Sequence, residues 1–442
     1  MSDFEVAIVG AGLVGLVAAA ALSRAGISVV VFEATSSPQE VGAGVGIGPN
    51  AVRALKGLGV FDAILARAKE PEGVQRTFHF HSPIDPHGCV FHYQTSCPDP
   101  VALPIYRPTF LEAVIGLLDP SIIHFNKRCT SISIAENGKH IVHFSDGTNH
   151  EAELIIGADG VKSVTRSYVV GEHTKNPLVF TNTVAIEGSY LTEDLRSAGL
   201  KTEFAGHKLI TFLGSGKHII GFSIKGGTVI NFVVLVADHD KPKGPQLPPP
   251  WVESTTSEEL KSHFESWGHD PMIILDHLKN PSKWSIHAVN PLESFVRDKV
   301  VLIGDSAHAM LPHLGAGVGQ GFEDVFVLVQ LLTHPQARKA NLPDILAQYN
   351  RVRPPRANAI LRKSQWAGEI YDSYRSEEDN GRIQQCLSGY LEDVWGHDLE
   401  KDVASAFEVL HRSHIFRVSK NSDDLSKILR REKKDSEEHT PV

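Results

Sequence analysis

The chain has 442 residues, of which 42% are hydrophobic and 21% charged, a composition typical of a packed globular protein with two or more domains. Its formal net charge of -9 argues against a surface that binds nucleic acid, and no uninterrupted apolar run is long enough to span a membrane. The four cysteines, which are not spaced as a metal site or a redox pair, are Cys89, Cys97, Cys129 and Cys386. They predict free thiols, no bound metal and a cytoplasmic protein. Length and acidity are compatible with a monomer or a homodimer.

The N-terminal residues have the pattern of a βαβ unit. Residues 4–9 form an apolar run that predicts a buried strand, residues 16–25 predict a helix of small side chains, and residues 27–32 predict a second strand. Because the first strand begins so early, the sequence argues against a signal peptide. The unit predicts a parallel, buried sheet, and therefore an α/β fold.

Three glycines and one acid in this unit indicate a dinucleotide site. Gly10 allows the tight turn, Gly12 lets the backbone approach a pyrophosphate, and Gly15 lets the helix pack on the strand. Glu33 follows the second strand, where its carboxylate can bind ribose hydroxyls, and an acid here favours FAD or NAD over NADP. The alternative is a tight turn without a ligand, and the complete order of strand, helix, second strand and acid argues against it.

The middle of the chain combines a second turn motif with β-rich segments. Residues 71–104 are predicted to be irregular or β-rich. The motif Gly-Ala-Asp-Gly follows an apolar run and places Asp159 at the carboxyl end of a predicted strand, where parallel sheets bind ligands. A simple turn remains an equal alternative for this motif. Residues 178–237 predict a β-rich block, within which a meander is formed by residues 207–213, 217–224 and 229–236.

Residues 304–324, which read GDSAHAMLPHLGAGVGQGFED, combine an acid, two histidines, a proline and four glycines at alternating positions. They follow a strand-like run at 299–303 and precede an apolar helical pattern at 325–332. Alternating glycines let the backbone approach a flat ligand closely. The N-terminus of the following helix carries partial positive charge and free N–H groups, which suits a large cofactor that becomes anionic.

Three motifs in this order and spacing carry a family resemblance: the turn at Gly10, the turn that contains Asp159, and the pair Gly304-Asp305. With them, residues 4–370 resemble the single-component FAD-dependent aromatic hydroxylases. Within that family the chain is most similar to the salicylate hydroxylases. The stretches that carry this closer match are GAGVGIGPNAVRAL at 42–55, PHLGAGVGQGFED at 312–324 and YNRVRPPRA at 349–357.

The resemblance implies a Rossmann-like FAD-binding domain with an inserted β-sheet substrate domain and a C-terminal helical region. The FAD-binding domain would comprise residues 1–175 and 291–370, and the substrate domain residues 176–290. The helical region and a charged tail would comprise residues 371–442. NAD(P)H would bind without a Rossmann domain of its own, which fits the single early glycine motif.

The resemblance also implies roles for individual residues around FAD. Glu33 would bind the adenosine ribose, Arg107 the ribityl or pyrophosphate region, and Asp305 the ribityl chain. Asp159 would lie near FAD and support the use of NAD(P)H. Backbone N–H groups of Gly317 and its neighbours would face the pyrimidine edge of the flavin. The full set of implied cofactor-binding residues is Gly10, Gly12, Gly15, Glu33, Ala43, Arg107, Asp159, Asp305, Gly317 and Val318.

The implied reaction is the hydroxylation of a phenolic aromatic acid. NAD(P)H reduces the flavin, dioxygen adds to it to form a flavin hydroperoxide, and the electrophilic oxygen attacks the ring. In a salicylate-type reaction, attack at the carboxyl-bearing carbon releases carbon dioxide and leaves a catechol. Two alternatives stay open: hydroxylation of a larger phenolic metabolite without decarboxylation, and a flavin-dependent oxidase or dehydrogenase. A non-catalytic flavin-binding regulator is a third alternative, although it would be expected to lack the glycine-rich segment.

The reacting end of the site has its own candidate residues. His313 is the candidate base for the phenol proton, because an unperturbed histidine pKa of about 6.5 suits proton transfer at neutral pH; a structural bond within the loop is the alternative. Pro312 would pack beside the isoalloxazine ring. Phe222 and Phe232 would line an aromatic substrate pocket, with packing in the β core as the alternative for each. His308 is expected to hold the turn in place.

Overall fold

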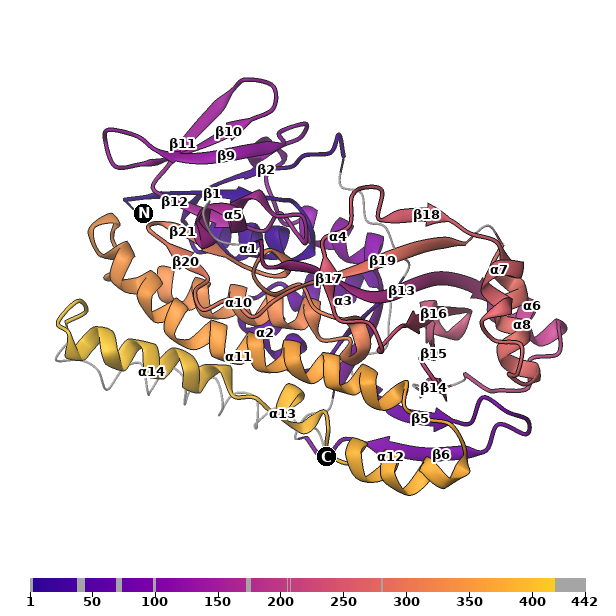
Figure 1. The fold of residues 1–442 in the computed structure, drawn as a ribbon. Coiled ribbons are helices and arrows are strands. Elements are labelled where there is room, and N and C mark those ends of the chain that lie inside the picture. The colour runs from indigo at the N-terminus through magenta and orange to yellow at the C-terminus, as the bar shows by residue number, and fades with distance from the viewer. Residues whose placement is uncertain are drawn as a thin grey trace.

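The structure is a computed structural model that describes residues 3–37, 44–68, 74–97, 101–171, 176–204, 206, 208–279 and 281–417. It contains a six-stranded sheet, a nine-stranded sheet and two three-stranded sheets, with long helices along one side (Figure 1). The predicted α/β fold is confirmed. Among the described residues, no helix is both long and apolar enough to cross a membrane.

The six-stranded sheet has the strand order β20-β21-β12-β1-β2-β8, and all of its neighbouring strands run parallel except β20 and β21. Its strands are β1 (Glu5–Val9), β2 (Ser28–Phe32), β8 (Ile123–His124), β12 (Leu154–Gly157), β20 (Val296–Arg297) and β21 (Val300–Leu302). The apolar side chains of the central strands are buried, since helices cover a parallel sheet on both faces. This sheet contains the predicted βαβ unit, with α1 (Leu13–Arg24) between β1 and β2.

Small residues bring α1 close to helix α10 (Gly317–Leu332). A Cβ atom built on Gly321 would lie only 2.5 Å from Cγ2 of Val14, so a larger residue would push the two helices apart. A Cβ on Gly304 would likewise lie 3.2 Å from the same methyl group. The glycines in the 304–324 segment therefore serve helix packing as well as any ligand.

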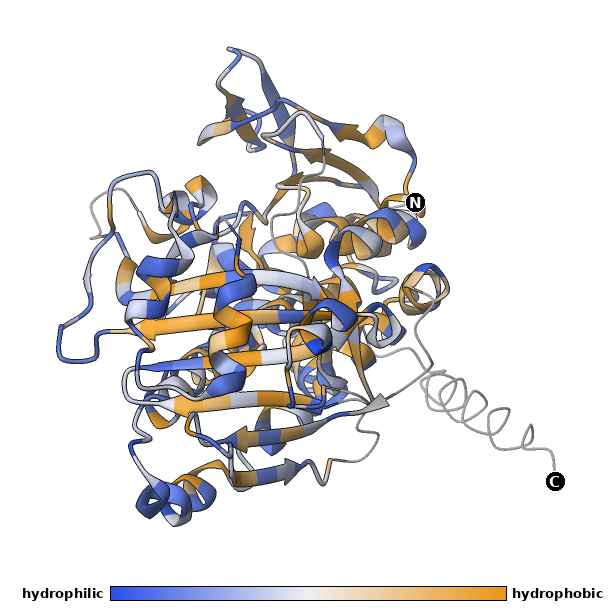
Figure 2. Cartoon of the chain, turned by 90° about the vertical axis from the view of Figure 1, so that its right-hand side faces the viewer, coloured by the Kyte–Doolittle hydropathy of each residue, from blue (hydrophilic) through white to orange (hydrophobic). Residues whose placement is uncertain are grey.

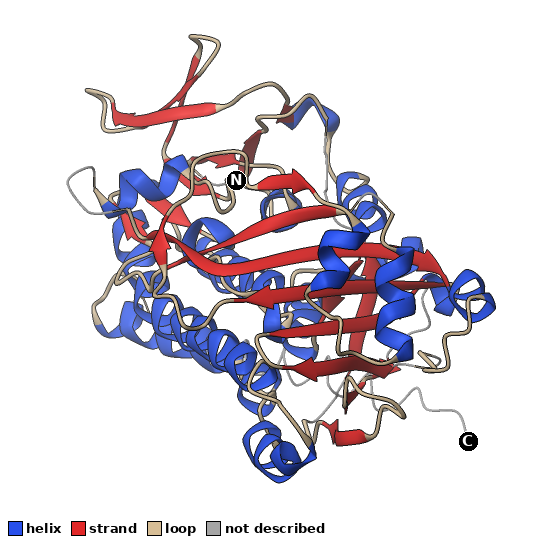
Figure 3. Cartoon of the chain, turned by 45° about the vertical axis from the view of Figure 1, so that its right-hand side comes forward, coloured by secondary structure: helices blue, strands red, loops and turns tan. Residues whose placement is uncertain are grey.

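The nine-stranded sheet contains the predicted meander and is covered on one face by short helices (Figure 3). Its strands are β5 (Thr77–His81), β6 (Cys89–Gln94), β13 (Leu178–Leu191), β14 (Lys208–Gly214), β15 (Lys217–Ile224), β16 (Val229–Ala237), β17 (Gly244–Pro245), β18 (Val252–Ser254) and β19 (Ser282–Val289). The helices on that face are α6 (Thr192–Ser197), α7 (Ser257–Ser262) and α8 (His269–His277). Strands β14, β15 and β16 pair antiparallel in sequence order, as predicted.

Two strands of this sheet come from a region that was placed in the first FAD-binding segment. β5 pairs parallel with β14, about 130 residues later in the chain, and β6 pairs with β5 at the edge of the sheet. The boundary at residue 175 therefore does not separate the two large sheets. Pairing between segments so far apart depends on tertiary contacts, which local patterns do not contain.

The remaining elements connect and cover the two large sheets. The other strands are β3 (Gly44–Ile47), β4 (Val74–Gln75), β7 (Val101–Tyr106), β9 (Cys129–Ile134), β10 (His140–Phe144) and β11 (Asn149–Ala152). The other helices are α2 (Pro49–Gly57), α3 (Phe61–Ala68), α4 (Arg107–Ile115), α5 (Val164–Val170), α9 (Asp305–His308), α11 (Leu342–Tyr371), α12 (Asn380–Leu387), α13 (Glu392–Trp395) and α14 (Leu399–Arg412). Short 3₁₀ turns are η1 (Pro120–Ile122), η2 (Lys225–Gly227), η3 (Pro312–Leu314), η4 (Lys339–Asn341) and η5 (Glu377–Asp379). Several strands of the nine-stranded sheet are largely hydrophobic (Figure 2). The charged tail from residue 423 lies outside the described residues.

A buried cluster of charges joins α10 to α11. The guanidinium of Arg353 bonds to Glu323 (Nη1 to Oε2, 2.9 Å) and Asp324 (Nε to Oδ1, 2.8 Å), and all three side chains are fully buried. Asp324 also accepts a bond from the backbone N–H of Gly304 at 2.9 Å and pairs with Nε2 of His308 at 2.6 Å. His308 therefore holds the turn, as predicted. The cluster ties the middle of α10 to the turn after strand β21.

Replacing Arg353 by Met should lower the free energy of unfolding by about 3–5 kcal/mol, because Glu323 and Asp324 would become buried charges without their partner. Urea unfolding at neutral pH measures this change. The matched control is Arg351→Met, since Arg351 lies exposed on the same helix and bonds only to Gln348 and Ser405 among the described residues. The control should change stability by less than about 1 kcal/mol, and equal losses in the two variants would contradict the assignment.

Candidate active site

The predicted motifs lie just after the carboxyl ends of four neighbouring strands of the six-stranded sheet. Glu33 directly follows β2 and Gly10 directly follows β1, whereas one residue separates Asp159 from the end of β12 and two residues separate Asp305 from the end of β21. Because these strands are parallel, their carboxyl ends meet at one edge of the sheet. Ligands of such sheets bind beyond this edge. The structure thus assembles the motifs side by side, although they are spread over about 295 residues, from Gly10 to Asp305.

The glycine turn is closely packed against the second motif. Gly10 has φ +107°, and a Cβ atom there would lie 2.3 Å from the carbonyl oxygen of Ala158. A Cβ on Gly15 would lie 2.1 Å from the carbonyl oxygen of Gly10. Gly12 caps the N-terminus of α1, so that the free N–H groups of the helix start point beyond the sheet edge. Side chains larger than glycine would therefore clash with the backbone at Gly10 and Gly15.

The two acids at this end of the sheet have different surroundings. Oε2 of Glu33 accepts a bond from the N–H of Ala11 at 2.8 Å, which ties the second strand to the glycine turn. Asp159 instead caps α5: its two oxygens accept bonds from Ser163, Val164 and Thr165 at 2.6 to 3.0 Å. Among the described residues, Asp159 therefore contributes to the start of α5, and its role beside FAD stays a prediction.

A cavity of about 340 Å³ lies where the sheet edge meets the nine-stranded sheet. Its walls come from β3, from residues 310–318, from one face of β14 to β16, and from the C-terminal helical region. The lining residues are Gly44, Val45, Gly46, Ile47, Gly48, Arg76, Phe78, Ala102, Arg107, Leu209, Thr211, Ile220, Phe222, Val233, Leu235, Asp305, Met310, Leu311, Pro312, His313, Leu314, Gly315, Ala316, Gly317, Val318, Tyr371, Tyr390 and Trp395.

Seven of the predicted site residues line this cavity together. They are Arg107, Phe222, Asp305, Pro312, His313, Gly317 and Val318. Of these, Gly317 and Val318 begin α10, whose first N–H groups lack partners within the helix and carry partial positive charge. Ala43, also predicted to bind the cofactor, lies outside the described residues.

The two predicted pocket phenylalanines point in opposite directions. Phe222 lines the cavity, whereas Phe232 is fully buried in the core between the sheet and its covering helices. The register explains the difference, because Phe232 pairs with Gly221 and successive residues of a strand face opposite sides. The prediction for Phe232 is therefore wrong, and its alternative, core packing, is what the structure shows.

His313 lies in the cavity wall but has an environment that the sequence did not predict. Its ring is only 6% exposed and packs on α11, where a Cβ on Gly368 would lie 2.3 Å from it. Burial, followed by the nearby His218, lowers the pKa of His313 from the usual 6.5 to about 3. The expectation of an unperturbed pKa is wrong, and the imidazole of the free protein is neutral at physiological pH.

Several cavity residues were not predicted. Arg76 is buried, and its guanidinium lies 5.2 Å from the centroid of the Phe222 ring. Tyr371, Tyr390 and Trp395 come from the C-terminal helical region, to which the sequence assigned no role in the site. Arg76 stands alone in an alternating strand-like run, and the aromatic residues stand in polar helices. Nothing in the residues around them in the sequence indicates that they line a cavity with distant segments.

The wall formed by β3 fits a flat ligand. A Cβ on Gly44 would lie 3.2 Å from the ring of Phe222, and a Cβ on Gly48 would lie 2.6 Å from Nε1 of Trp395. Larger residues at these positions would fill the cavity from one side. The positive end of α10, which lines the same cavity, suits a cofactor that becomes anionic on reduction. The residues present therefore fit a flavin.

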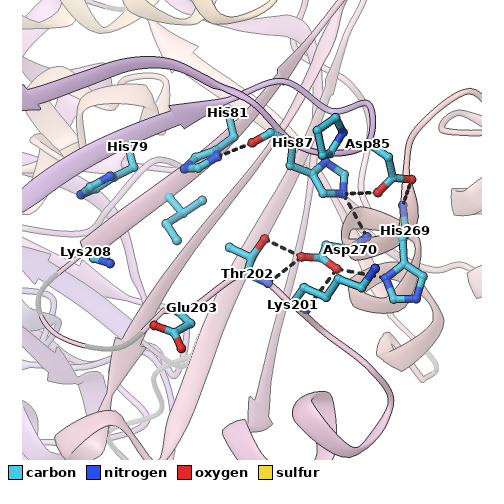
Figure 4. A pocket seen from close by; sticks show the side chains of 12 residues that line it. His79, His81, Asp85, His87, Lys201, Thr202, Glu203, Lys208, His269 and Asp270 are labelled. Atoms are coloured by element: carbon cyan, nitrogen blue, oxygen red, sulfur yellow. Dashed lines mark hydrogen bonds and ion pairs between the residues drawn. The ribbon is translucent and has the colours of Figure 1, made fainter.

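A second cavity of about 650 Å³ lies on the other face of the nine-stranded sheet (Figure 4). His79 and His81 line it from β5, whereas Phe78 of the same strand lines the first cavity. Its polar groups bond mainly to one another, as when the buried Asp270 accepts bonds from the backbone N–H and the hydroxyl of Thr202. Among the described residues, no cluster of three histidine, cysteine or acidic side chains is placed to hold a metal. Although this cavity is larger, the sheet separates it from the predicted motifs.

Comparisons with known proteins agree with this geometry. The family described as FAD binding domain matches residues 3–364. A salicylate hydroxylase of Pseudomonas putida is 36% identical over 419 residues, which cover 91% of this chain and 94% of that protein. A 6-methylsalicylate 1-monooxygenase of Aspergillus terreus is 30% identical and is matched over 90% of each chain.

A solved structure is similar over almost the whole chain. A salicylate hydroxylase in a substrate complex has a TM-score of 0.79 and 30% identity, and the match covers 92% of this chain and 98% of that one. The resemblance seen in the sequence is thereby confirmed, as is FAD as the cofactor. With its glycine turn, its cavity and these relatives, the chain belongs to the FAD binding domain family and is an FAD-dependent aromatic monooxygenase.

Proposed function

We propose that the protein hydroxylates a small phenolic acid with NAD(P)H and dioxygen, in a salicylate-type reaction that releases carbon dioxide. When bound, FAD supplies the chemistry that accepts electrons from NAD(P)H and activates dioxygen. The observation that carries the proposal is the cavity, which brings a buried imidazole, a guanidinium and aromatic rings to the N-terminus of α10. Relatives named for salicylate and 6-methylsalicylate support the same substrate class.

The size of the cavity favours a small substrate over a large phenolic metabolite. Ligand pockets commonly range from about 300 to 1,000 Å³, and the cavity, at about 340 Å³, lies at the lower end of this range. Because it includes the space beside Gly317 and Val318 that is assigned to the flavin, the part left for the substrate is smaller still. Its lining is mostly apolar and aromatic, which suits one benzene ring with few polar groups. The same walls would exclude water from the reacting atoms.

Arg76 is the residue that we assign to the substrate carboxylate. It lies in the cavity wall beside Phe222, so a ring stacked near this phenylalanine would bring its carboxylate to the guanidinium. Guanidinium groups bind carboxylates through two parallel hydrogen bonds, which also fix the orientation of the ring. Arg107 begins α4 beside β7 and is assigned to the cofactor instead.

The cofactor assignments follow the order of the motifs along the sheet edge. Glu33 would bind the adenosine ribose, Asp305 and Arg107 the central part of FAD, and the N–H groups of Gly317 and Val318 the flavin. On this assignment, residues 1–175 and 291–370 bind the cofactor, and residues 176–290 cover the substrate. The β5-β6 hairpin joins the covering sheet.

His313 is the residue that we assign to the phenol proton. Its imidazole lines the cavity and is neutral in the physiological range, because burial lowers its pKa to about 3, so a ring nitrogen is available to accept a hydrogen bond from the phenol. Transfer of the phenol proton to the imidazole leaves a phenolate, which is a much better nucleophile than the phenol. Pro312 would shape the wall beside the flavin, next to this histidine.

A panel of hydroxybenzoates and larger phenols tests the proposed function. Salicylate-type acids should accelerate oxidation of NADH or NADPH and give a product that has gained oxygen and lost carbon dioxide, as read by mass. Arg76→Met should raise KM for these acids more than for phenols without a carboxylate. Stoichiometric peroxide without hydroxylated product would instead favour an oxidase, and turnover of large phenols alone would favour hydroxylation of a larger phenolic metabolite without decarboxylation.

His313→Gln should lower kcat about 100-fold, since general base catalysis typically contributes about 10²–10⁴-fold, while FAD stays bound. Because the pKa of His313 is already near 3, the wild-type kcat/KM should show no acid limb from this residue between about pH 5 and 8. A control is His334→Gln, whose pKa is also lowered by burial but which packs against Phe407 and Phe416 near α14. Unchanged turnover of His313→Gln at every pH would refute the base assignment.

Glu33→Ala should weaken FAD binding about tenfold or more, because it removes the ribose acceptor and the partner of the Ala11 N–H. Quenching of FAD fluorescence during titration of the apoprotein measures the affinity. Glu151→Ala, on exposed strand β11, is the matched control and should leave the affinity unchanged. If Glu33→Ala and the wild type bound FAD with equal affinity, Glu33 would not be the residue that binds the adenosine ribose.

A further inference from the structure

The cavity histidine is the first of four titratable side chains in a continuous row. The rings of His313 and His218 have centroids 5.2 Å apart. Nδ1 of His218 lies 2.6 Å from Oδ1 of Asp372, and Oδ2 of the same carboxylate lies 2.7 Å from Nε2 of His239. The row therefore combines η3, β15, the end of α11 and the turn after β16, which are distant in sequence.

The row runs from the cavity to the surface. His218 is fully buried and the side chain of Asp372 is 1% exposed, whereas 42% of the His239 side chain is exposed to solvent. A backbone bond from the N–H of Gly216 to the carbonyl oxygen of Asp372 at 2.9 Å holds the end of α11 against β15. His218 is therefore positioned by β15 and Asp372 by the end of α11, and His239 is held by its bond to Asp372.

Two nitrogens in the row are buried without a hydrogen-bond partner among the described residues. They are Nδ1 of His313 and Nε2 of His218, and they belong to neighbouring rings. Leaving a buried polar atom unpaired costs about 1–3 kcal/mol, so such atoms commonly have a reason. A centroid separation of 5.2 Å allows a hydrogen bond between these two rings once their nitrogens face each other.

The charges around the row favour movement of a proton outward. Burial and His218 lower the pKa of His313 to about 3, so an added proton is poorly held at the cavity end. At the surface end, the bond to Asp372 raises the pKa of His239, and Glu369 and Asp238 add to this effect. Burial would raise the pKa of Asp372, but His218 and His239 hold it at about 2. Tyr371 lies beside the rings of His218 and His313, and its hydroxyl bonds to that of Tyr390. Burial raises the pKa of both tyrosines, so both hydroxyls stay protonated.

We propose that His313, His218, Asp372 and His239 form a proton path from the substrate cavity to solvent. The phenol O–H bond breaks as an N–H bond forms on His313, and the opposite nitrogen of that ring passes its own proton to Nε2 of His218. His218 releases its Nδ1 proton to Asp372, which passes one to His239 and so to water. One proton leaves the substrate and one reaches solvent, and no electrons are transferred. The path rests on the proposed function, since it requires a phenol that ionises in the cavity.

The test uses the FAD-loaded protein and 4-nitrosalicylate, whose phenol and phenolate forms differ in colour. After a rapid jump from low to high pH, the absorbance of the bound probe reports how fast its phenol ionises. His239→Gln should slow this step about tenfold or more while binding of the probe and FAD stays unchanged, and added imidazole buffer should restore the rate by carrying the proton. His218→Asn should slow it in the same way without rescue, because His218 is out of reach of the buffer.

The matched control is His269→Gln. His269 is 44% exposed and bonds to the buried Asp270, which closely reproduces the setting of His239, but it belongs to the second cavity (Figure 4). This variant should ionise the probe at the wild-type rate. If His239→Gln and His218→Asn also match the wild type, the path is wrong although the proposed function stands. If the wild type leaves the bound probe protonated at every pH, the proposed function and the path both fail.

Discussion

The site depends on one buried group of charges. Glu323 and Asp324 occupy adjacent positions on α10 and are both bonded to Arg353 on α11. Burial would raise the pKa of Glu323, but Arg353 and Arg356 hold it at about 2, so the carboxylate stays ionised. Because removing charges from water is costly, such a cluster is stable only when every partner is in place. This requirement determines how α10 and α11 lie against each other.

The same cluster determines where the cavity forms. Asp324 bonds to the N–H of Gly304 and to His308, so the turn that presents Asp305 is held to the helix that presents Gly317. The start of α10 therefore points at the sheet edge with its N–H groups free. Arg353 itself never reaches the cavity, yet the position of the helix dipole there depends on it.

The C-terminal helical region has a larger part in the site than its polar sequence suggests. The end of α11 carries Gly368 against the ring of His313, and the next turn brings Tyr371 and Asp372 beside the cavity wall. Tyr390 and Trp395 close the same wall from farther along the chain. Burial of His313, to which α11 contributes, is the main cause of its lowered pKa, and His218 on β15 lowers it further, whereas the charge of Asp372 opposes this shift. The pKa of the cavity histidine is therefore set jointly by the C-terminal helical region and the nine-stranded sheet.

The sequence by itself determined the local parts of this protein: the βαβ unit, the glycine turns, the acid after the second strand and the helix start after the glycine-rich segment. Each of these depends on residues close together in the chain, where backbone sterics and strand or helix periodicity act directly. Tertiary structure alone decided that Phe222 faces the cavity and Phe232 the core, because the strand register sets the side of each residue. It also directed Asp159 to cap α5, placed Arg76 in the wall and buried His313 beside His218. Pairing register, burial and charge contacts between distant segments arise only when the whole chain packs, and they set the chemistry of the site.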